Sequence, residues 1–299
     1  MLNMKTIPLF DPSQEGSCIV HGNTLSVLQS FPNEHVQCVV TSPPYWGLRD
    51  YDIVGQIGLE ETLDEYIQNL TLVFSQVRRV LKPDGTLWLN IGDGFTSGNR
   101  RWRAPDKKNP ARAMNVRPDT PDGLKPKDLL GIPWKLAFAL QDDGWYLRSD
   151  IIWHKPNGMP ESVKDRPTRV HEYIFLLTKS EKYYYDYESV REPVGNRTRN
   201  RRSVWSVNTQ PFADAHFATF PPNLIKPCIL AGSREQDLVL DPFFGSGTVG
   251  LVCQQHSRKF LGIELNPEYV QIAANRLRID PSHIEIFEKE VPYEYAADD

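Results

Sequence analysis

Apolar residues along the chain follow two patterns. Short apolar runs that stop at Gly, Pro, Asn or Asp are typical of buried strands in a parallel sheet, and apolar residues three and four positions apart are typical of helices. We predict strands at 17–25 (ending at Gly22-Asn23), 36–42, 85–93, 147–154, 171–179, 237–241 and 259–264. We predict helices up to about Ser30, at 63–81, at 127–141 with a bend at Pro133, at 223–231, from the turn at 239–250 to about His256, and at 267–277. Strands that alternate with helices predict a doubly wound, mostly parallel α/β sheet.

Two stretches interrupt this alternation. Residues 94–126 are rich in Gly, Pro, Arg and Lys and contain few large aliphatic side chains, which predicts a long surface loop. Residues 186–222 are similarly irregular. Long loops inside a compact domain are uncommon unless they are functional or disordered. We predict a single domain, 1–299, that contains both stretches as insertions.

Composition narrows the class of protein. The 299 residues carry a formal net charge of −4, which argues against a uniformly basic nucleic-acid coat but not against a local basic face. The four cysteines lie far apart with no CxxC pair, so we expect a reduced protein without a cysteine zinc site, and no metal. Because the chain shows neither a signal pattern nor an apolar run of membrane-spanning length, we expect it in the cytoplasm.

A glycine-rich turn follows the strand at 237–241. In VLDPFFGSGTVG (239–250), Gly245, Gly247 and Gly250 have G-x-G-x-x-G spacing, and Glu264 closes the next strand. Such a turn lets the backbone approach a ligand, and the acidic side chain can accept hydrogen bonds from ribose hydroxyls, so any adenosine-bearing cofactor fits and a nicotinamide-dependent dehydrogenase is an alternative. Asp241 would repel a pyrophosphate but suits an ammonium group, which favours S-adenosylmethionine.

The segment TSPPYW (41–46) follows another buried strand, at the sheet edge where α/β proteins bind ligands. Its two prolines fix the backbone and leave carbonyls that can only accept hydrogen bonds. If Ser42 and the Pro43 carbonyl accept both N–H bonds of a base amino group, its nitrogen lone pair becomes available for reaction. Tyr45 offers a face for an extruded base. The alternative is a rigid turn whose aromatic rings pack in the core.

Together, TSPPYW and DPFFGSGT resemble the amino-methyltransferases of DNA in their β-type motif order, in which the catalytic segment precedes the cofactor turn. GTLWLNIGD, HFATFPPNLI (216–225) and FLGIELNPEY also resemble segments of that family. The resemblance implies a class-I S-adenosylmethionine-dependent (Rossmann-like) fold with a circularly permuted, seven-stranded sheet. It implies a catalytic segment of Ser42, Pro43, Pro44 and Tyr45. The cofactor-binding residues that it implies are Asn23, Thr41, Phe220, Pro221, Asn223, Asp241, Phe243, Gly245, Ser246, Gly247, Thr248, Glu264 and Asn266.

The permuted order predicts where the first strand lies. The βαβα unit at the end of the chain stops at the ribose-binding strand and its helix, so the strand that ends at Gly22-Asn23 should dock beside 259–264. Asn23 would then contact the adenine, although the family usually has Asp at this place. A helix-capping role for Asn23 before Thr24 is the alternative.

Double-stranded DNA is the partner that the resemblance implies. Between residues 94 and 127, nine Lys or Arg face three Asp. The family places its target-recognition region at 186–222, which is short here. The predicted DNA-binding residues are Arg100, Arg101, Arg103, Lys107, Lys108, Arg197, Arg199, Arg201, Arg202 and Trp205. A cognate restriction endonuclease and a second copy of the chain are further partners that the sequence leaves open.

The identity of the target base is the most specific prediction from the sequence. In the family, Ser-Pro-Pro-Tyr is typical of N4-cytosine enzymes and Asp-Pro-Pro-Tyr of N6-adenine enzymes, although some adenine enzymes carry serine. We therefore predict cytosine N4, with adenine N6 as the alternative. A C5-cytosine enzyme needs a cysteine nucleophile, and the only Pro-Cys pair, Pro227-Cys228, lies outside the catalytic segment. RNA or protein amide methylation typically uses Asn-Pro-Pro-Tyr.

Overall fold

The computed structural model describes residues 16–96, 118–210, 220–280 and 283–287. In these residues the strands are β1 (Cys18–His21), β2 (Val36–Thr41), β3 (Leu81–Ile91), β4 (Tyr146–His154), β5 (His171–Thr178), β6 (Glu192–Val194), β7 (Arg197–Arg199), β8 (Val204–Ser206), β9 (Leu238–Asp241), β10 (Lys259–Glu264) and β11 (Ile284–Ile286). The helices are α1 (Thr24–Ser30), α2 (Leu63–Val80), α3 (Ile132–Asp142), α4 (Pro222–Gly232), α5 (Thr248–Gln255) and α6 (Pro267–Leu277), with a short 3₁₀ turn, η2, at Glu188–Val190.

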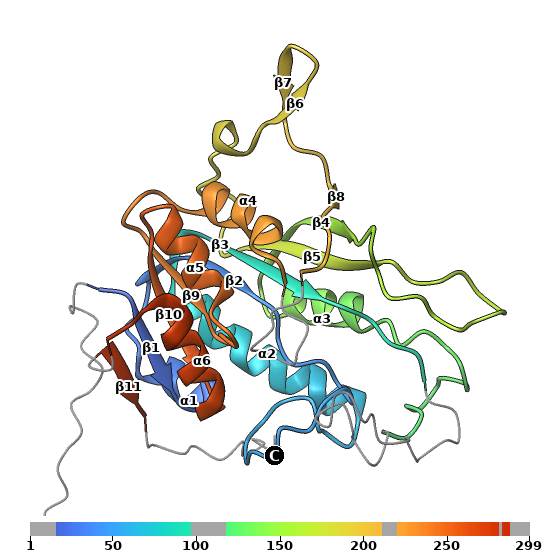
Figure 1. Cartoon of the computed structure of the whole chain (residues 1–299). Coiled ribbons are helices and arrows are strands. Elements are labelled where there is room, and N and C mark those ends of the chain that lie inside the picture. Colours follow the sequence, from blue (N-terminus) through green and yellow to red (C-terminus); the bar gives the residue numbers. More distant parts are fainter. Residues whose placement is uncertain (1–15, 97–117, 211–219, 281–282, 288–299) are drawn as a thin grey trace, which may run out of the picture.

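One twisted sheet runs through the molecule (Figure 1). In the described residues it has nine strands in the order β11-β1-β10-β9-β2-β3-β5-β4-β8. Strand β5 runs antiparallel to its neighbours β3 and β4, and the other pairs are parallel. All seven predicted strands are present, and β8 and β11 add one three-residue strand at each edge. The doubly wound α/β prediction is confirmed.

Strand β1 lies beside β10, as the permuted motif order predicted. The two strands are parallel, and the register places His21 opposite Glu264. On its other side β10 pairs with β9, and β9 pairs in turn with β2. From β9 the next strand, β10, is added on one side, and from β2 the next strand, β3, is added on the other. The order in which strands are added therefore reverses between β9 and β2. In open α/β sheets, ligands bind at such a switch point.

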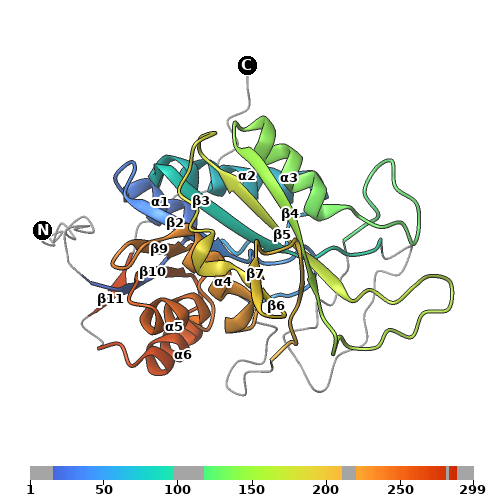
Figure 2. The ribbon, with the colours of Figure 1, turned by 90° about the horizontal axis from the view of Figure 1, so that it is seen from above.

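Helices cover both faces of the sheet (Figure 2). Helices α1, α2 and α3 pack on one face, and α4, α5 and α6 pack on the other. Helix α2 carries one apolar face, with Leu70, Val73 and Phe74 fully buried, and burying each such side chain stabilises the fold by about 1.5–3 kcal/mol. The helix starts at a capping box in which Thr62 and Glu65 bond each other's backbone N–H groups.

Prolines lie in two of the helices, α3 and α4. The predicted bend at Pro133 is wrong, because α3 begins at Ile132 and Pro133 lies in its first turn. A backbone N–H is not needed in the first turn, so Pro133 is accommodated there without a bend. Pro227 does lie inside α4, and the helix predicted at 223–231 forms around it. Strand β3 starts at Leu81, directly after α2 and earlier than the predicted residue 85, with an irregularity in its pairing with β2.

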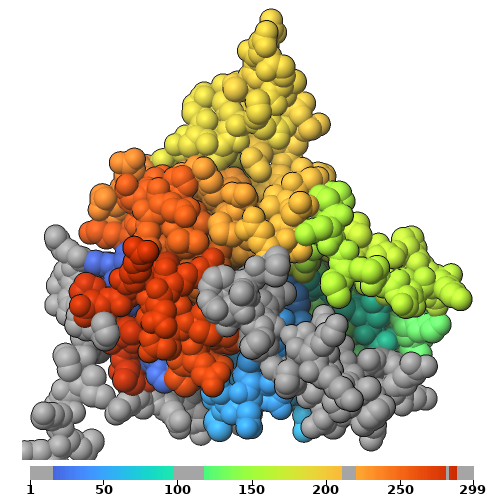
Figure 3. Space-filling model, in the orientation of Figure 1, coloured from blue at the N-terminus to red at the C-terminus, as the bar shows by residue number. Residues whose placement is uncertain are grey.

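A hairpin projects from the body of the protein (Figures 1 and 3). It consists of β6 and β7, which pair antiparallel with Val194 opposite Arg197. The hairpin belongs to the stretch 186–222, which the sequence predicted to be irregular. The stretch returns to the main sheet through β8, which pairs with β4. No helix in the described residues is long and apolar enough to cross a membrane.

Candidate functional site

The predicted cofactor and catalytic residues meet at one edge of the sheet. Strands β1, β10, β9 and β2 are consecutive and parallel, so their carboxyl ends lie together. Those ends carry Asn23, Glu264, Asp241 and Ser42. The segments that supply them come from the two ends of the sequence, and the permuted strand order brings them together.

Asp241 links the two motifs directly. The Thr41 hydroxyl donates a hydrogen bond of 2.7 Å to Asp241 Oδ1, and the Phe243 backbone N–H donates one of 3.1 Å to the same oxygen. Asp241 is 1% exposed, and burial raises the pKa of its carboxyl to about 7. Thr41 is fully buried, so its side chain orients Asp241. Within the described residues both bonds go to Oδ1, so Oδ2 retains acceptor capacity for a ligand cation.

Glu264 holds the glycine turn in place. Its carboxylate accepts the Gly245 N–H at 2.7 Å and the Asn266 N–H at 2.8 Å, and burial raises its pKa. Gly245 has a φ of +51°, and a Cβ there would meet no heavy atom of the described chain within 4 Å. The backbone therefore leaves an open approach beside the partly buried Glu264 carboxylate, which fits the adenosine and amino-acid parts of S-adenosylmethionine.

Other residues of the turn are held by the protein itself. Arg276, at the end of α6, donates to the Ser246 carbonyl and hydroxyl and to the Thr248 hydroxyl at 3.0–3.1 Å. Burial lowers the pKa of this guanidinium. A Cβ at Gly250 would lie 2.8 Å from Leu277 Cδ1, so this glycine serves helix packing instead of ligand approach. No sequence motif indicates the role of Arg276, because it meets the turn only in the folded chain.

Asn23 caps a helix, which was the alternative to adenine contact. Its side-chain oxygen accepts the Ser26 N–H at 3.2 Å, and its amide donates to the Gly55 carbonyl at 3.4 Å. The loop after the catalytic segment therefore reaches the end of β1. In the same loop, the ring of Tyr51 lies 6.1 Å from that of Tyr269, edge to face, near Glu264. Adenine contact by Asn23 stays a prediction.

The remaining predicted cofactor residues lie in the turn itself and at the starts of α4 and α6. Asn266 caps α6 by accepting the Glu268 N–H at 2.8 Å. Phe243 is partly buried against the core of the α1–α3 layer, and Phe220 against that of the α4–α6 layer. Pro221 precedes α4, and Asn223 is exposed in its first turn. HFAT (216–219), the start of the predicted additional segment, lies outside the described residues.

The catalytic segment is fixed by bonds from its neighbours. The Tyr66 hydroxyl, on α2, donates to the Pro44 carbonyl at 2.8 Å. Trp46 is buried, and its indole N–H donates to the Glu60 carbonyl at 3.0 Å. The Glu60 carboxylate in turn accepts from the Gly58 N–H and from the Asn69 side chain. The backbone that carries Ser42 and Pro43 is therefore held on the side of α2.

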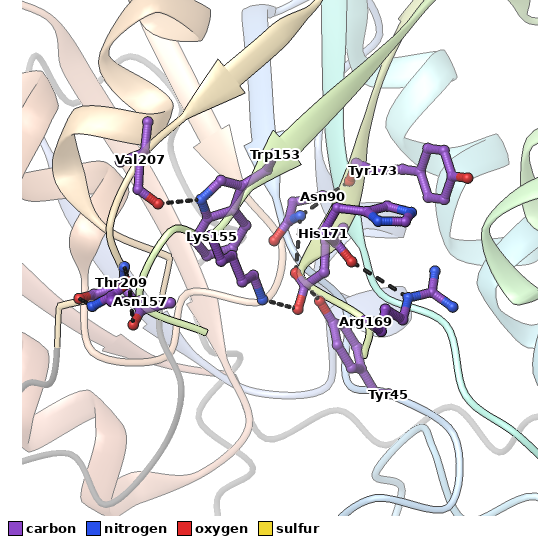
Figure 4. Close-up of polar contacts among 11 residues, drawn as sticks. Tyr45, Asn90, Trp153, Lys155, Asn157, Arg169, His171, Tyr173, Val207 and Thr209 are labelled. Carbon is purple, nitrogen blue, oxygen red and sulfur yellow. Dashed lines mark hydrogen bonds and ion pairs between the residues drawn. The ribbon is translucent and has the colours of Figure 1, made fainter. Parts of the chain in front are cut away.

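Tyr45 belongs to a polar cluster that the sequence did not reveal (Figure 4). Its hydroxyl donates a hydrogen bond of 2.9 Å to Glu172 Oε2, at the start of β5. Asn90, on β3, donates to the same oxygen at 3.3 Å, and Lys155 forms an ion pair with Glu172 Oε1. Burial and then the Glu172 carboxylate hold the pKa of the Tyr45 hydroxyl well above its ordinary value. The hydroxyl therefore stays a donor.

The predicted DNA-binding arginines and lysines divide into three groups. Arg100, Arg101, Arg103, Lys107 and Lys108 lie outside the described residues. Arg199 and Arg202 bond Glu192 at 2.7 and 3.0 Å, and Arg201 stacks 4.5 Å from the Trp205 ring, so their charge is partly used within the hairpin region. Arg197 is exposed on β7.

The burial of Trp205 corrects the prediction that this residue contacts DNA. It is 6% exposed, its indole N–H donates to the Arg202 carbonyl at 2.6 Å, and its ring packs in the core of the α4–α6 layer. Trp205 lies on β8, and the packing of its ring stabilises the position of β8 at the edge of the sheet.

Comparisons with known proteins agree with this site. A family model for N6- and N4-methyltransferases, described as DNA methylase, matches residues 36–275. The chain is 67% identical over 270 residues to the Type II methyltransferase M.Cfr9I of Citrobacter freundii, covering 90% of each chain. It is 58% identical over 281 residues to M.SmaI of Serratia marcescens, covering 91% of this chain and 96% of that protein.

Solved structures resemble the fold. A putative DNA modification methylase of Thermus thermophilus, complexed with S-adenosyl-L-methionine, superposes with a TM-score of 0.62 at 25% identity, covering 92% of this chain and 99% of that one. The PvuII DNA methyltransferase (cytosine-N4-specific) superposes with a TM-score of 0.66 at 23% identity, covering 90% of each chain. At that identity the second likeness concerns the fold alone.

Proposed function

Because the chain belongs to the family of N6- and N4-specific DNA methylases, we propose that it methylates the exocyclic N4 of a cytosine in double-stranded DNA. DNA is its substrate and S-adenosylmethionine its cofactor, so the nicotinamide alternative is excluded. The observation that carries the choice of base is Ser42 at the head of Pro43-Pro44-Tyr45. The residue before it, Thr41, donates a hydrogen bond to the buried Asp241.

The chain's own residues solve the chemical problem of the base. An amino nitrogen conjugated to a pyrimidine ring is a poor nucleophile. In our proposal the Ser42 hydroxyl and the Pro43 carbonyl accept hydrogen bonds from the two N–H groups of this nitrogen and make its lone pair available for reaction. Tyr45 stacks on the extruded ring. A hydroxyl is a weaker acceptor than a carboxylate, so the Pro43 carbonyl contributes more than Ser42.

The cofactor residues divide the work by charge. Asp241 would accept the ammonium group of the methionine part, and Glu264 the ribose hydroxyls, while Gly245 lets the backbone approach. When bound, S-adenosylmethionine supplies a methyl group on a positively charged sulfur. Since Thr41 holds Asp241 and is followed directly by Ser42, the groups that bind the cofactor and the base are fixed relative to each other.

Transfer of a labelled methyl group tests this function. The purified chain is incubated with S-adenosylmethionine labelled at the methyl group and with unmethylated double-stranded DNA, single-stranded RNA or a denatured protein extract. We expect label in DNA only, and a lower rate for Ser42→Ala with DNA binding retained. Label in RNA or protein, but not in any of several DNA substrates, would contradict the proposal.

A restriction-modification role is the proposed biological setting. M.Cfr9I, M.XycI and M.SmaI carry Type II methyltransferase names and are 58–68% identical to the chain, which covers at least 90% of each. A cognate restriction endonuclease would then share its DNA site. Digestion of genomic DNA from the source cell, with and without an intact gene for this chain, by that endonuclease tests the role, because only methylated DNA should resist cleavage.

Cofactor binding should depend on pH through Asp241. With a pKa of about 7, the free protein carries a neutral Asp241 carboxyl at acidic pH, whereas an ammonium ligand favours the charged form. Affinity should therefore rise with pH and level off above about pH 7, with about tenfold weaker binding at pH 6 than at pH 8. Calorimetry from pH 5.5 to 8 measures it, and the same titration of Asp241→Asn should be nearly flat. A wild-type affinity that is constant or falls with rising pH would contradict the assignment.

The hairpin should contribute to DNA affinity through Arg197. Removing one phosphate contact should weaken binding to every DNA sequence and lower the slope of log affinity against log salt by about 1. Fluorescence anisotropy of Arg197→Ala at several salt concentrations measures both effects. Lys135→Ala, on the exposed face of α3, is the matched control. If Arg197→Ala has the wild-type slope, the hairpin does not contact phosphates through this residue.

A further inference from the structure

The Glu172 carboxylate is the meeting point of four elements. Tyr45 follows β2, Asn90 lies on β3, Lys155 follows β4, and Glu172 is the second residue of β5. Figure 4 shows Tyr45, Asn90 and Lys155 pointing toward one place from three sides. The Glu172 side chain is 16% exposed and that of Lys155 is 18% exposed. A carboxylate so enclosed is costly unless it is paired and hydrogen-bonded, and here both its oxygens are engaged.

The shape of the neighbouring backbone also serves Tyr45. A Cβ at Gly92, just after β3, would lie 2.8 Å from Cε2 of the Tyr45 ring and 3.3 Å from Cγ and Cδ of Glu172. The absence of a side chain at this position lets the ring and the carboxylate lie against the sheet end together. The ring is thus confined by Gly92 on its edge and by Glu172 at its hydroxyl.

Lys155 connects this cluster to the stretch that follows the hairpin. Its ammonium lies 4.1 Å from the centre of the Trp153 ring, and the Trp153 indole N–H donates to the Val207 carbonyl at 2.8 Å. Two residues beyond Lys155, Asn157 bonds the backbone of Thr209 at 2.8 and 3.0 Å. The position of Lys155 is therefore set by contacts at the carboxyl end of the parallel β4–β8 pair.

We propose that Glu172 is a positioning residue for the methyl-transfer reaction. It fixes the hydroxyl end of Tyr45, so that the ring is held in the orientation in which the target base stacks on it. Lys155 balances the charge of the Glu172 carboxylate. This inference rests on the proposed role of Tyr45 in base stacking. Glu172 acts through Tyr45 and not on the reacting atoms. Stacking needs one ring orientation, and a ring free to swing about its χ angles would present that orientation only part of the time.

A double-mutant cycle tests the proposal. The rate constant for methyl transfer is measured in single turnovers at saturating cofactor and saturating duplex, with the methylated site first located by sequencing DNA modified by the wild-type chain. Glu172→Ala should lower this constant by about 10- to 150-fold, the range for losing one hydrogen bond to a charged group. Tyr45→Phe should lower it by a similar factor. In the Tyr45→Phe background, Glu172→Ala should lower it by less than about threefold, because the shared contact is already lost.

The conservative variant and the cofactor provide the controls. Glu172→Gln keeps an oxygen that can accept from Tyr45, so it should restore most of the rate. Cofactor affinity by calorimetry should match the wild type in every variant, and Glu181→Gln, an exposed carboxylate just after β5, should leave the rate unchanged. Equal losses from Glu172→Ala in both backgrounds would overturn the proposal. So would a wild-type rate for Tyr45→Phe, which decides the matter even if Glu172→Ala does not fold. A wild-type chain that methylates no DNA would instead refute the proposed function.

Discussion

Replacing Asp241 by asparagine should weaken the binding of S-adenosylmethionine by about 10- to 150-fold, the effect of losing one charge-assisted hydrogen bond. The asparagine side-chain oxygen can still accept from the Thr41 hydroxyl and the Phe243 N–H, so the link between β2 and β9 survives. What is lost is the negative charge that would face the ligand's ammonium group. Isothermal calorimetry at pH 8, where the wild-type carboxyl is ionised, measures the change.

The matched control for this change is Asp142→Asn. Asp142 is exposed at the end of α3, on the opposite layer of the molecule from α5 and α6. This variant should bind the cofactor like the wild type. A folded Asp241→Asn protein with undiminished affinity would show that Asp241 only braces the Thr41 hydroxyl.

Replacing Tyr45 by alanine should lower kcat/KM for DNA by about 5- to 150-fold, since stacking of a base on an aromatic ring contributes roughly 1–3 kcal/mol. The change also removes the hydroxyl that bonds Glu172, so the effect should lie toward the upper end of that range. Steady-state methylation assays measure it, together with cofactor affinity, which should not change.

Tyr146→Ala is the control for the loss of an aromatic ring. Tyr146 is 46% exposed at the start of β4, away from the sheet edge that carries Ser42. Its loss should leave kcat/KM within about a factor of two, as is usual for exposed positions. Full activity in Tyr45→Ala would contradict the stacking role and would favour the alternative that the Ser-Pro-Pro-Tyr segment is only a rigid turn.

Much of the fold follows from local patterns in the sequence. The apolar periodicity of 63–81 and its turn signals mark a helix that forms as predicted, and the order of the motifs places β1 beside β10. Errors arose where one residue has two uses. Pro133 can bend a helix or begin one, and Trp205 can lie on a basic surface or in the core. Which use applies depends on neighbours distant in sequence.

The site was predictable to a more limited extent. Ser42, Asp241 and Glu264 stand in local motifs, and the sheet brings those motifs together. Their supporting residues do not stand in motifs. Arg276 reaches Ser246 across 30 residues, and Glu172 reaches Tyr45 across 127. A glutamate near the start of a strand and an arginine near a helix end are common, so only the tertiary contacts distinguish them.

The nucleoside product tests the central claim most directly. Unmethylated plasmid DNA is treated with the wild-type chain and S-adenosylmethionine, hydrolysed to nucleosides and analysed by mass spectrometry against authentic standards. The Ser42-Pro43-Pro44-Tyr45 segment predicts N4-methylcytosine as the new nucleoside, absent when a Ser42→Ala/Tyr45→Ala double variant replaces the wild type. N6-methyladenine without N4-methylcytosine would contradict the proposed base while leaving the fold and the cofactor assignment in place.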